Sequence, residues 1–224
     1  MTHGQSKAQA RGLWIAFFGP DGVGKSAVIE RLQGSVGGAF SGGRCFHFRP
    51  RFGRRSDRAP VTEPHAQRAR GLIISISKLI YWLLDCWFGY LALIGPSLQR
   101  SGLVVFDRYL PDLLVDPMRY RLPASANSFA AKLAKLAPQP DLYILLDAPA
   151  ETVRRRKQEI SLPEAQRQRI AYLKLFKSLP NTLVVAADCP VEDIAQHLAT
   201  AISSFIPNLP ASQKAAFVAD ARLN

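Results

Sequence analysis

Residues 19–26 read GPDGVGKS and match the pattern GxxxxGK[ST]. An apolar run at 13–18 precedes them, and residues 24–32 have a helical pattern. Glycines let the backbone turn tightly, so successive N–H groups and the start of the next helix face one anion. The sequence therefore predicts a triphosphate-binding loop between a buried strand and a helix, and a phosphotransferase that uses ATP and Mg²⁺.

This loop also predicts the residues that contact the nucleotide. Lys25 is expected to bridge the β- and γ-phosphates, and Ser26 is expected to ligate Mg²⁺. The residues expected to contact the cofactor here are Gly19, Asp21, Gly22, Val23, Gly24, Lys25, Ser26 and Ala27.

Short apolar segments alternate with helical patterns along the rest of the chain. Its 224 residues suit one α/β domain, expected at 13–206 between a flexible N-terminus at 1–12 and a tail at 207–224. Alternating strands and helices imply parallel strands joined by right-handed crossovers. Strands are expected at 13–18, 44–48, 103–106, 142–146 and 183–187. Helices are expected at 24–32, 72–98, 128–136, 150–177 with a break near Pro163, and 191–205.

Asp107 and Arg108 follow the third expected strand, which should neighbour the first. Acids at the carboxyl ends of parallel strands face the ligand crevice, and a carboxylate there commonly holds Mg²⁺ in such enzymes. Asp107 is therefore a catalytic and metal-site candidate, with a turn cap as the alternative. Arg108 is expected to direct its guanidinium into the same crevice, with a surface salt bridge as the alternative.

The chain is basic, with 29 Lys and Arg against 17 Asp and Glu and a net charge of +12. This excess favours anionic partners. Residues 44–70 hold eight Arg and two acids, which suits either a solvated loop or an anion-binding loop on the acceptor side. Because the chain has no recognised nucleic-acid motif, nucleic acid is not an expected partner.

Residues 72–98 are apolar apart from Lys78 and Asp85, and approach the length of a membrane span. Both charges are costly in hydrocarbon, and a parallel sheet needs long apolar helices over its faces. We therefore expect a covering helix and no transmembrane span, while peripheral membrane contact stays open. A buried Asp85 needs a partner, either structural, with Lys78 on the same helix face, or in the acceptor pocket.

The cysteines Cys45, Cys86 and Cys189 lie far apart, and no CxxC pair is present. Small buried thiols in a reducing compartment are the simplest interpretation. The first twelve residues contain no apolar stretch of the kind found in signal peptides. We therefore expect a cytoplasmic location.

Several motifs, in order, resemble those of thymidylate kinases and related nucleoside monophosphate kinases. The loop GPDGVGKS and the FDRY at 106–109 are similar to the family's phosphate loop and Asp-Arg-Tyr. PDLYILLDAPAETVRRRK at 140–157 resembles its fourth strand and lid, and ADCP at 187–190 resembles the loop beside adenine. The resemblance implies a three-layer P-loop kinase fold, with a five-stranded parallel sheet flanked by helices, a short helical lid at 150–178, and Mg-ATP as donor.

The same resemblance assigns roles to individual residues. Asp21 corresponds to the acid that contacts the acceptor sugar, and Arg108 to the arginine that grips the acceptor phosphate. Members with a glycine at the position of Gly22 place their catalytic arginines in the lid. The lid candidates are Arg154, Arg155, Arg156 and Lys157, and Arg167 or Arg169 could close from the far side. Arg155 and Arg156 are the two that we predict to be catalytic. The alternative is that these residues form a solvated helix face. Asp188 is expected beside the nucleotide, and Arg49, Asp85 and Tyr109 on the acceptor side.

Two acceptor motifs depart from the family pattern. The segment LPDLLVDPMRYR at 110–121 lacks the family's Tyr-Gln element and carries new charges, namely Asp112, Asp116, Arg119 and Arg121. The family's Thr-Arg-Glu-Pro becomes His47-Phe48-Arg49-Pro50. The ATP half of the site is kept, whereas the acceptor half is rebuilt.

Three functions follow from this pattern. The first is phosphoryl transfer to a nucleoside monophosphate, with dTMP as the leading acceptor. The second is a kinase acting on a hydroxyl of a sugar, glycan or lipid headgroup, which benefits from a carboxylate base. The third is a non-catalytic nucleotide-binding module. The resemblance favours the first, and related kinases make a homodimer a further expectation.

Overall fold

The computed structural model describes residues 11–36, 40–50, 69–157 and 161–205. The expected flexible N-terminus, except for residues 11 and 12, and the expected tail lie outside the described residues. Most of the basic segment, at 51–68, lies outside them as well.

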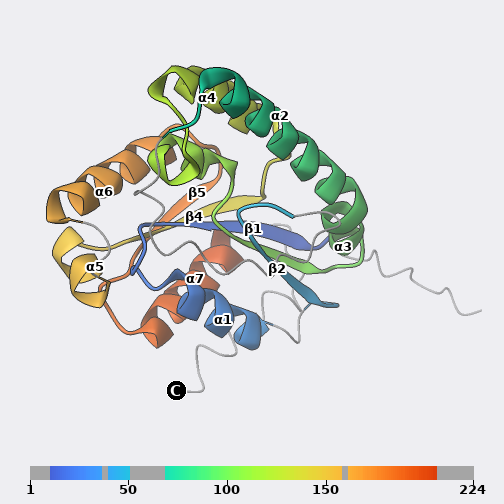
Figure 1. The fold of residues 1–224 in the computed structure, drawn as a ribbon. Helices are drawn as coiled ribbons and strands as arrows, with labels where there is room; N and C mark the ends of the chain where they lie inside the picture. Colours follow the sequence, from blue (N-terminus) through green and yellow to red (C-terminus); the bar gives the residue numbers. More distant parts are fainter. Residues whose placement is uncertain (1–10, 37–39, 51–68, 158–160, 206–224) are drawn as a thin grey trace, which may run out of the picture.

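Five parallel strands form one sheet in the order β2-β3-β1-β4-β5 (Figure 1). The strands are β1 Leu13–Phe18, β2 Gly43–His47, β3 Leu103–Asp107, β4 Leu142–Asp147 and β5 Thr182–Ala186. The first strand pairs with both β3 and β4, so the strand that leads into the phosphate loop is central. The predicted five-stranded parallel sheet is confirmed. The inner strands β1, β3 and β4 are buried apolar runs that need cover on both faces, whereas the edge strand β2 is mostly exposed.

Helices cover both faces of the sheet, which gives three layers. In Figure 1, α1 and α7 lie on one side of the sheet and α2, α4 and α6 on the other. The helices are α1 Lys25–Val36, α2 Leu72–Gly89, α3 Gly95–Gln99, α4 Asn127–Leu136, α5 Ala150–Arg156, α6 Leu162–Phe176 and α7 Val191–Phe205. A π-helical turn, η3 Tyr90–Ile94, joins α2 to α3, and the 3₁₀ turns η4 Leu110–Leu114, η5 Met118–Tyr120 and η6 Ala124–Ala126 follow β3.

Two apolar cores flank the sheet, and alternate residues of β1 divide between them. Ile15 and Phe17 belong to the core under α1 and α7. Trp14, Ala16 and Phe18 belong to the core under α2, α4 and α6. All six residues of β1 are buried, so the sheet holds the following loop on a rigid support.

The long apolar segment forms α2, η3 and α3 in succession and covers the sheet, as expected. This helix, Leu72–Gln99, is long and apolar enough to cross a membrane, and 33% of its most apolar window is buried. A Cβ at Gly89 would collide with the ring of Pro50, so glycine allows the end of the β2 connection to pack on α2. That contact brings Arg49 beside the helix.

Helix α5 ends at Arg156 and α6 begins at Leu162, so the helical segment is interrupted near Pro163, as expected. Pro163 occupies the first turn of α6, where its missing N–H costs no hydrogen bond. One expectation needs correction. Only Cys86 is buried, whereas Cys45 is exposed because β2 is an edge strand.

Candidate functional site

The phosphate loop lies between β1 and α1. Its backbone takes positive φ at Gly19, Gly22 and Gly24, with values of 139°, 88° and 102°. A Cβ at Gly22 would lie 2.8 Å from the Cβ of Lys157, so the loop also packs closely against the end of α5. Val23 is buried, while Ser26 and Ala27 are exposed on the first turn of α1. This is the backbone that an anion-binding loop requires.

Lys25 lies within this loop and is only 6% exposed. Its Nζ donates to the carbonyl oxygens of Gly19 at 2.9 Å and Pro20 at 3.0 Å. Burial, followed by the positive charge of Arg108, lowers the pKa of Lys25 to about 7. A phosphate bound beside Nζ would favour the charged form of Lys25, because a nearby negative charge stabilises an ammonium group.

Asp107 ends β3 opposite Phe17 on β1 and His47 on β2. Its Oδ2 lies 3.4 Å from His47 Nδ1, while its Oδ1 is buried and has no hydrogen-bond partner among the described residues. Burial alone would raise the pKa of Asp107, but the His47 hydrogen bond and the Lys25 charge outweigh it and lower that pKa. An ionised carboxylate with an unpaired oxygen at this edge fits Mg²⁺.

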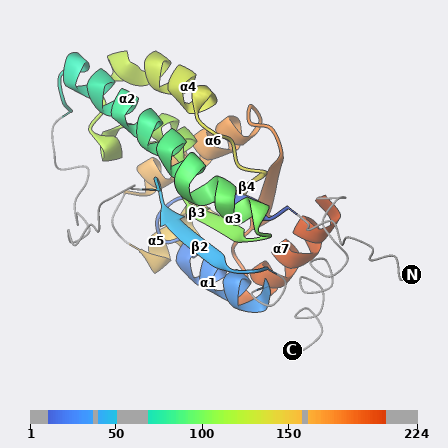
Figure 2. The same ribbon diagram turned by 90° about the vertical axis from the view of Figure 1, so that its right-hand side faces the viewer.

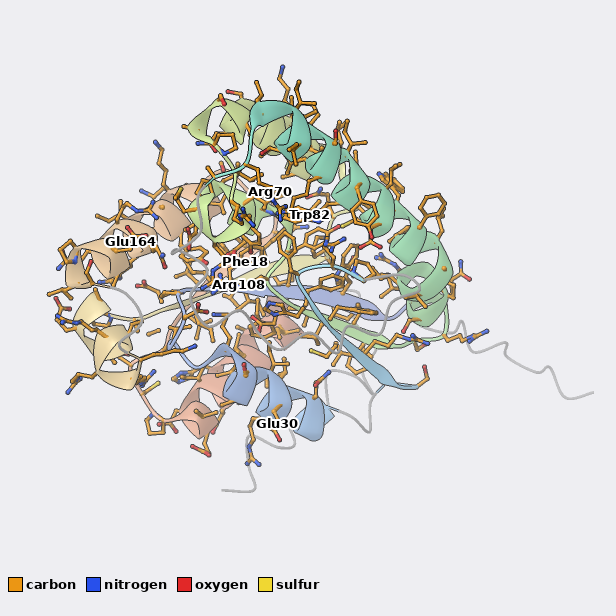
Figure 3. The ribbon with its side chains drawn as sticks, viewed as in Figure 1. Phe18, Glu30, Arg70, Trp82, Arg108 and Glu164 are labelled. Atoms are coloured by element: carbon orange, nitrogen blue, oxygen red, sulfur yellow. The ribbon has the colours of Figure 1, made fainter. Side chains whose placement is uncertain are left out.

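Arg108 follows Asp107 and turns into the layer between the sheet and the helices above it (Figure 3). Its φ is 68°, a strained value for a residue with a Cβ, and its N–H donates to Phe17 O at 2.9 Å. The side chain is 3% exposed. One terminal nitrogen contacts both oxygens of Asp112 at 2.9 Å, and the other donates to Asp21 at 2.6 Å. The surface salt bridge considered above is therefore wrong.

Asp112 is fully buried and accepts hydrogen bonds from two tyrosines as well. The hydroxyls of Tyr120 and Tyr172 each lie 2.6 Å from one of its oxygens, and Tyr172 also accepts from Arg108 at 2.7 Å. Burial raises the pKa of both tyrosines, so they act as neutral donors. Sequence reasoning missed these tyrosines. The only signal was that a buried carboxylate needs donors.

Asp21 lies where the cations of the site meet. It pairs with Arg108 and with Arg119, and its Oδ1 lies 4.0 Å from Lys25 Nζ. Arg119 also lies 3.6 Å from Asp116. The Asp116 carboxylate accepts from the Gln168 amide at 3.3 Å. The structure thus joins the phosphate loop to the rebuilt 110–121 segment through one carboxylate.

Arg49 and Asp85, both predicted on the acceptor side, pair with each other at 2.7 Å. The Arg49 guanidinium also lies 5.4 Å from the ring centre of Tyr81 and 5.2 Å from that of Trp82. Lys78 instead donates to the Tyr120 carbonyl at 2.8 Å. The structure therefore gives Asp85 a structural ion pair with an arginine from the β2 connection, while Lys78 on the same helix contacts a backbone carbonyl.

Tyr109 does not face the acceptor side, contrary to the expectation. It is 1% exposed, and its hydroxyl donates to the Pro138 carbonyl at 2.9 Å. Its ring packs edge-on against Trp14 and Phe106 in the core under α2. Tyr109 is therefore a core residue next to Arg108 in the sequence, with a structural role.

The predicted lid arginines divide between the site and the surface. Arg156 donates to the carbonyl oxygens of Val23 at 3.2 Å and Ala187 at 2.9 Å, so it joins α5 to the phosphate loop. Arg155 is exposed and donates to Thr152 of its own helix at 3.4 Å. Arg154, Lys157 and Asp188 are exposed as well. On α6, Arg169 forms a two-point ion pair with Asp147 at 2.7 and 2.8 Å, while Arg167 pairs with Glu164 at 2.6 Å.

Comparisons with known proteins identify relatives of the whole chain. No family model matches the chain. The thymidylate kinase of Leifsonia xyli subsp. xyli is 30% identical over 201 residues, which cover 84% of this chain and 92% of that relative. The thymidylate kinase of Xanthomonas campestris pv. campestris (strain B100) is 31% identical over 142 residues, which cover 63% of this chain and 58% of that relative.

Two solved structures share the fold at low sequence identity. Thymidylate kinase from Ehrlichia chaffeensis superimposes with a TM-score of 0.56 at 16% identity, covering 86% of this chain and 99% of that one. Thymidylate kinase from Candida albicans superimposes with a TM-score of 0.64 at 15% identity, covering 89% and 94%. The chain therefore belongs to the thymidylate kinase family and is a P-loop kinase, not a non-catalytic nucleotide-binding module.

Proposed function

We propose that the protein transfers the γ-phosphoryl group of ATP to a nucleoside monophosphate, with dTMP as the leading acceptor. The observation that carries this proposal is the meeting of two cations at Asp21. Lys25 of the donor loop lies 4.0 Å from this carboxylate, and Arg108 lies 2.6 Å from it. One cation thus serves the transferring phosphate and the other the acceptor phosphate, and transfer needs both close together.

On the donor side, the loop N–H groups and Lys25 would hold the β- and γ-phosphates. Bound Mg²⁺ neutralises charge on the phosphate oxygens, and Ser26 and Asp107 are the residues that would hold it. Cys45 is exposed on the neighbouring edge strand, and no cluster of three His, Cys, Asp or Glu side chains suitable for a metal occurs in the described part of the chain. The free oxygen of Asp107 is therefore the main protein support for a metal here.

On the acceptor side, a monophosphate is already ionised and needs positioning more than a base. Its phosphate would take the place of Asp21 at one terminal nitrogen of Arg108, and the released Asp21 would face the acceptor sugar. Asp112 would keep the other nitrogen in place, because it holds it with two 2.9 Å contacts. Arg49, fixed by Asp85 beside two aromatic rings, lies on the same side.

The segment 150–178 would act as a lid over the nucleotide. Arg156 already contacts the phosphate loop and would turn its guanidinium toward the phosphates of a bound nucleotide. Arg169 is held by Asp147 at the carboxyl end of β4 and would have to leave that carboxylate to take part. Charge neutralisation by one such arginine accelerates phosphoryl transfer strongly in other enzymes.

A second candidate is a kinase that acts on a hydroxyl of a sugar, glycan or lipid headgroup. The observation that favours it is the charge at the acceptor side, where two arginines face three carboxylates: Arg108, Arg119, Asp21, Asp112 and Asp116. A site already neutralised by its own carboxylates suits an uncharged acceptor better than a dianion. Asp21 would then be the base nearest the attacking hydroxyl.

Product analysis with γ-labelled ATP separates the two candidates. With dTMP, we expect label in a nucleoside diphosphate, and we expect Lys25→Ala to lower the rate by about a hundredfold or more. Arg108→Ala should raise the dTMP KM while leaving the ATP KM within a small factor. Normal turnover in Lys25→Ala would refute the donor assignment. Label on a hydroxyl acceptor, with none on any monophosphate, would select the second candidate.

A further inference from the structure

Two arginines from the segment after β3 meet at the carboxylate of Asp21 in the phosphate loop. One terminal nitrogen of Arg108 donates to Oδ1 at 2.6 Å, and a terminal nitrogen of Arg119 donates to Oδ2. Each oxygen of this one carboxylate therefore holds its own guanidinium. Another anionic group that took the place of the carboxylate would find both guanidiniums already directed at it.

Each arginine also has a second carboxylate that holds it when Asp21 moves away. Arg108 contacts both oxygens of Asp112 at 2.9 Å. The Nε atom of Arg119 lies 3.6 Å from Asp116, and the Asp116 carboxylate also accepts from the Arg119 backbone N–H at 3.1 Å. Both supporting carboxylates are buried. The two guanidiniums are therefore pre-organised around the position that Asp21 occupies.

The fold fixes the backbone that carries Arg119. This residue lies in the 3₁₀ turn η5, and its neighbour Tyr120 donates a hydroxyl hydrogen bond to the buried Asp112 at 2.6 Å. Helix α6 lies on the same side of the sheet as α2 (Figure 2), and its Gln168 amide donates to Asp116 at 3.3 Å. Contacts on both sides of Arg119 thus hold the turn in place.

The two arginines differ in depth. The Arg108 side chain is 3% exposed and the Arg119 side chain is 22% exposed, so Arg119 is the member nearer to solvent. Arg49, the other arginine predicted on the acceptor side, is engaged elsewhere, because its guanidinium pairs with Asp85 at 2.7 Å. In the described part of the chain, the second arginine at Asp21 is therefore Arg119 and not Arg49.

A phosphate monoester suits this pair of arginines better than the Asp21 carboxylate does. It carries a charge of about −1.5 to −2 at pH 7 and has three terminal oxygens, whereas a carboxylate has one charge and two oxygens. The planar guanidinium group binds phosphate through paired N–H donors. Replacing Asp21 by a phosphate therefore strengthens the attraction to both arginines, while each arginine keeps its supporting carboxylate.

We infer that Arg119 is the second arginine that binds the acceptor phosphate, and that this phosphate displaces Asp21 from Arg108 and Arg119 together. This role rests on the proposed function and adds to it a residue that selects acceptors. Arg119 favours a nucleoside monophosphate over the corresponding nucleoside, because only the monophosphate presents an anion to both guanidiniums.

Equilibrium dialysis without ATP tests this role separately from turnover. The ligands are the nucleoside monophosphate with the fastest turnover, expected to be dTMP, and its own nucleoside. Arg119→Gln should raise the Kd of the monophosphate about tenfold or more, because a charge-assisted contact is lost, and should leave that of the nucleoside within about twofold. Arg119→Lys should recover part of the loss, since lysine keeps the charge but not the planar fork.

Turnover gives a second measurement of the same effect. Arg119→Gln should raise the monophosphate KM by a similar factor and leave the ATP KM within about twofold. Arg100→Gln is the matched control, because Arg100 is exposed just before the amino end of β3, while the phosphate loop follows the carboxyl end of β1. It should bind both ligands as the unaltered chain does, and circular dichroism shows whether each variant is folded.

Three results would overturn the role of Arg119. Unchanged monophosphate binding by folded Arg119→Gln would show that the phosphate does not contact this arginine. Tighter binding by that variant would show that Arg119 only holds Asp21 against the acceptor. Equal weakening of monophosphate and nucleoside would leave Arg119 a structural residue.

Failure of the proposed function gives a different result. If monophosphate binding depends on Arg119 but the label of γ-labelled ATP passes only to a hydroxyl acceptor, the arginine pair is supported and the proposed transfer is refuted. If the folded, unaltered chain binds no nucleoside monophosphate, both are refuted.

Discussion

The buried ion pair between Arg49 and Asp85 allows a direct test of why a carboxylate lies within the apolar helix α2. The two groups are 2.7 Å apart, with side chains 15% and 5% exposed. Removing one member of such a pair leaves an uncompensated buried charge, which costs about 3–5 kcal/mol. Arg49 would keep its contacts with two aromatic rings, which recover about 1 kcal/mol. We therefore expect Asp85→Leu to destabilise by about 2–4 kcal/mol and Arg49→Met by about 3–5 kcal/mol.

Combining the two substitutions should restore most of the lost stability. With neither charge left, apolar side chains fill the site, and the net loss should be about 0–1 kcal/mol, which gives a coupling energy of about 4 kcal/mol or more. Urea unfolding followed by circular dichroism measures all four chains. Additive losses, or a cost below about 1 kcal/mol for Asp85→Leu, would show that this carboxylate is not held by Arg49.

Three further predictions follow from the site. Gly22→Ala places a Cβ 2.8 Å from the Cβ of Lys157 at a φ of 88°. We therefore expect it to lower the unfolding free energy by about 2 kcal/mol and to weaken nucleotide binding. Gly34→Ala is the control, because no atom lies within 4 Å of its added Cβ, and it should be neutral or stabilising. Asp107→Asn should raise the Mg²⁺ concentration needed for half-maximal turnover without unfolding the chain; an unchanged requirement would remove this residue from the metal site. Burial, and then Arg70, lowers the pKa of Lys78 from 10.5 to about 8. The unfolded chain therefore holds more protons between pH 8 and 10, and the cost of this lysine falls as pH rises. Because Lys78 is only partly buried and solvent screens its charge, the unfolding free energy of the unaltered chain should rise relative to that of Lys78→Met by only about 1 kcal/mol from pH 7 to pH 10, and a constant difference would contradict it.

Local pattern was enough to predict the strands and the phosphate loop. All five strands were predicted within one residue of their observed bounds. For β1, β3 and β4 the signal was a buried apolar run, because a strand covered on both faces needs apolar side chains on both. Asp107 was correctly placed next to β1, since the carboxyl ends of parallel strands lie at one edge.

The sequence could not predict side-chain direction beyond the strand ends. Alternation would place Phe106 and Arg108 on one face and Tyr109 on the other, but the left-handed backbone at Arg108 shifts the alternation, and Tyr109 joins Phe106 in the core. No local signal marks that φ value in a residue other than glycine.

Pairings between distant residues were also out of reach. Arg119 contacts Asp21 across 98 residues, and Tyr172 contacts Asp112 across 60. These contacts depend on how η4, η5 and α6 pack over β3, and periodicity carries no information about that packing.

Phosphorylation of a nucleoside monophosphate by this kinase is tested most directly by ADP release with Mg-ATP, measured across dTMP, other nucleoside monophosphates, and sugar or glycan acceptors. We expect turnover that depends on a monophosphate, is fastest with dTMP, and is lost in Lys25→Ala. Turnover with hydroxyl acceptors alone would contradict it and show that the acceptor site around Arg108 and Asp112 serves a different substrate.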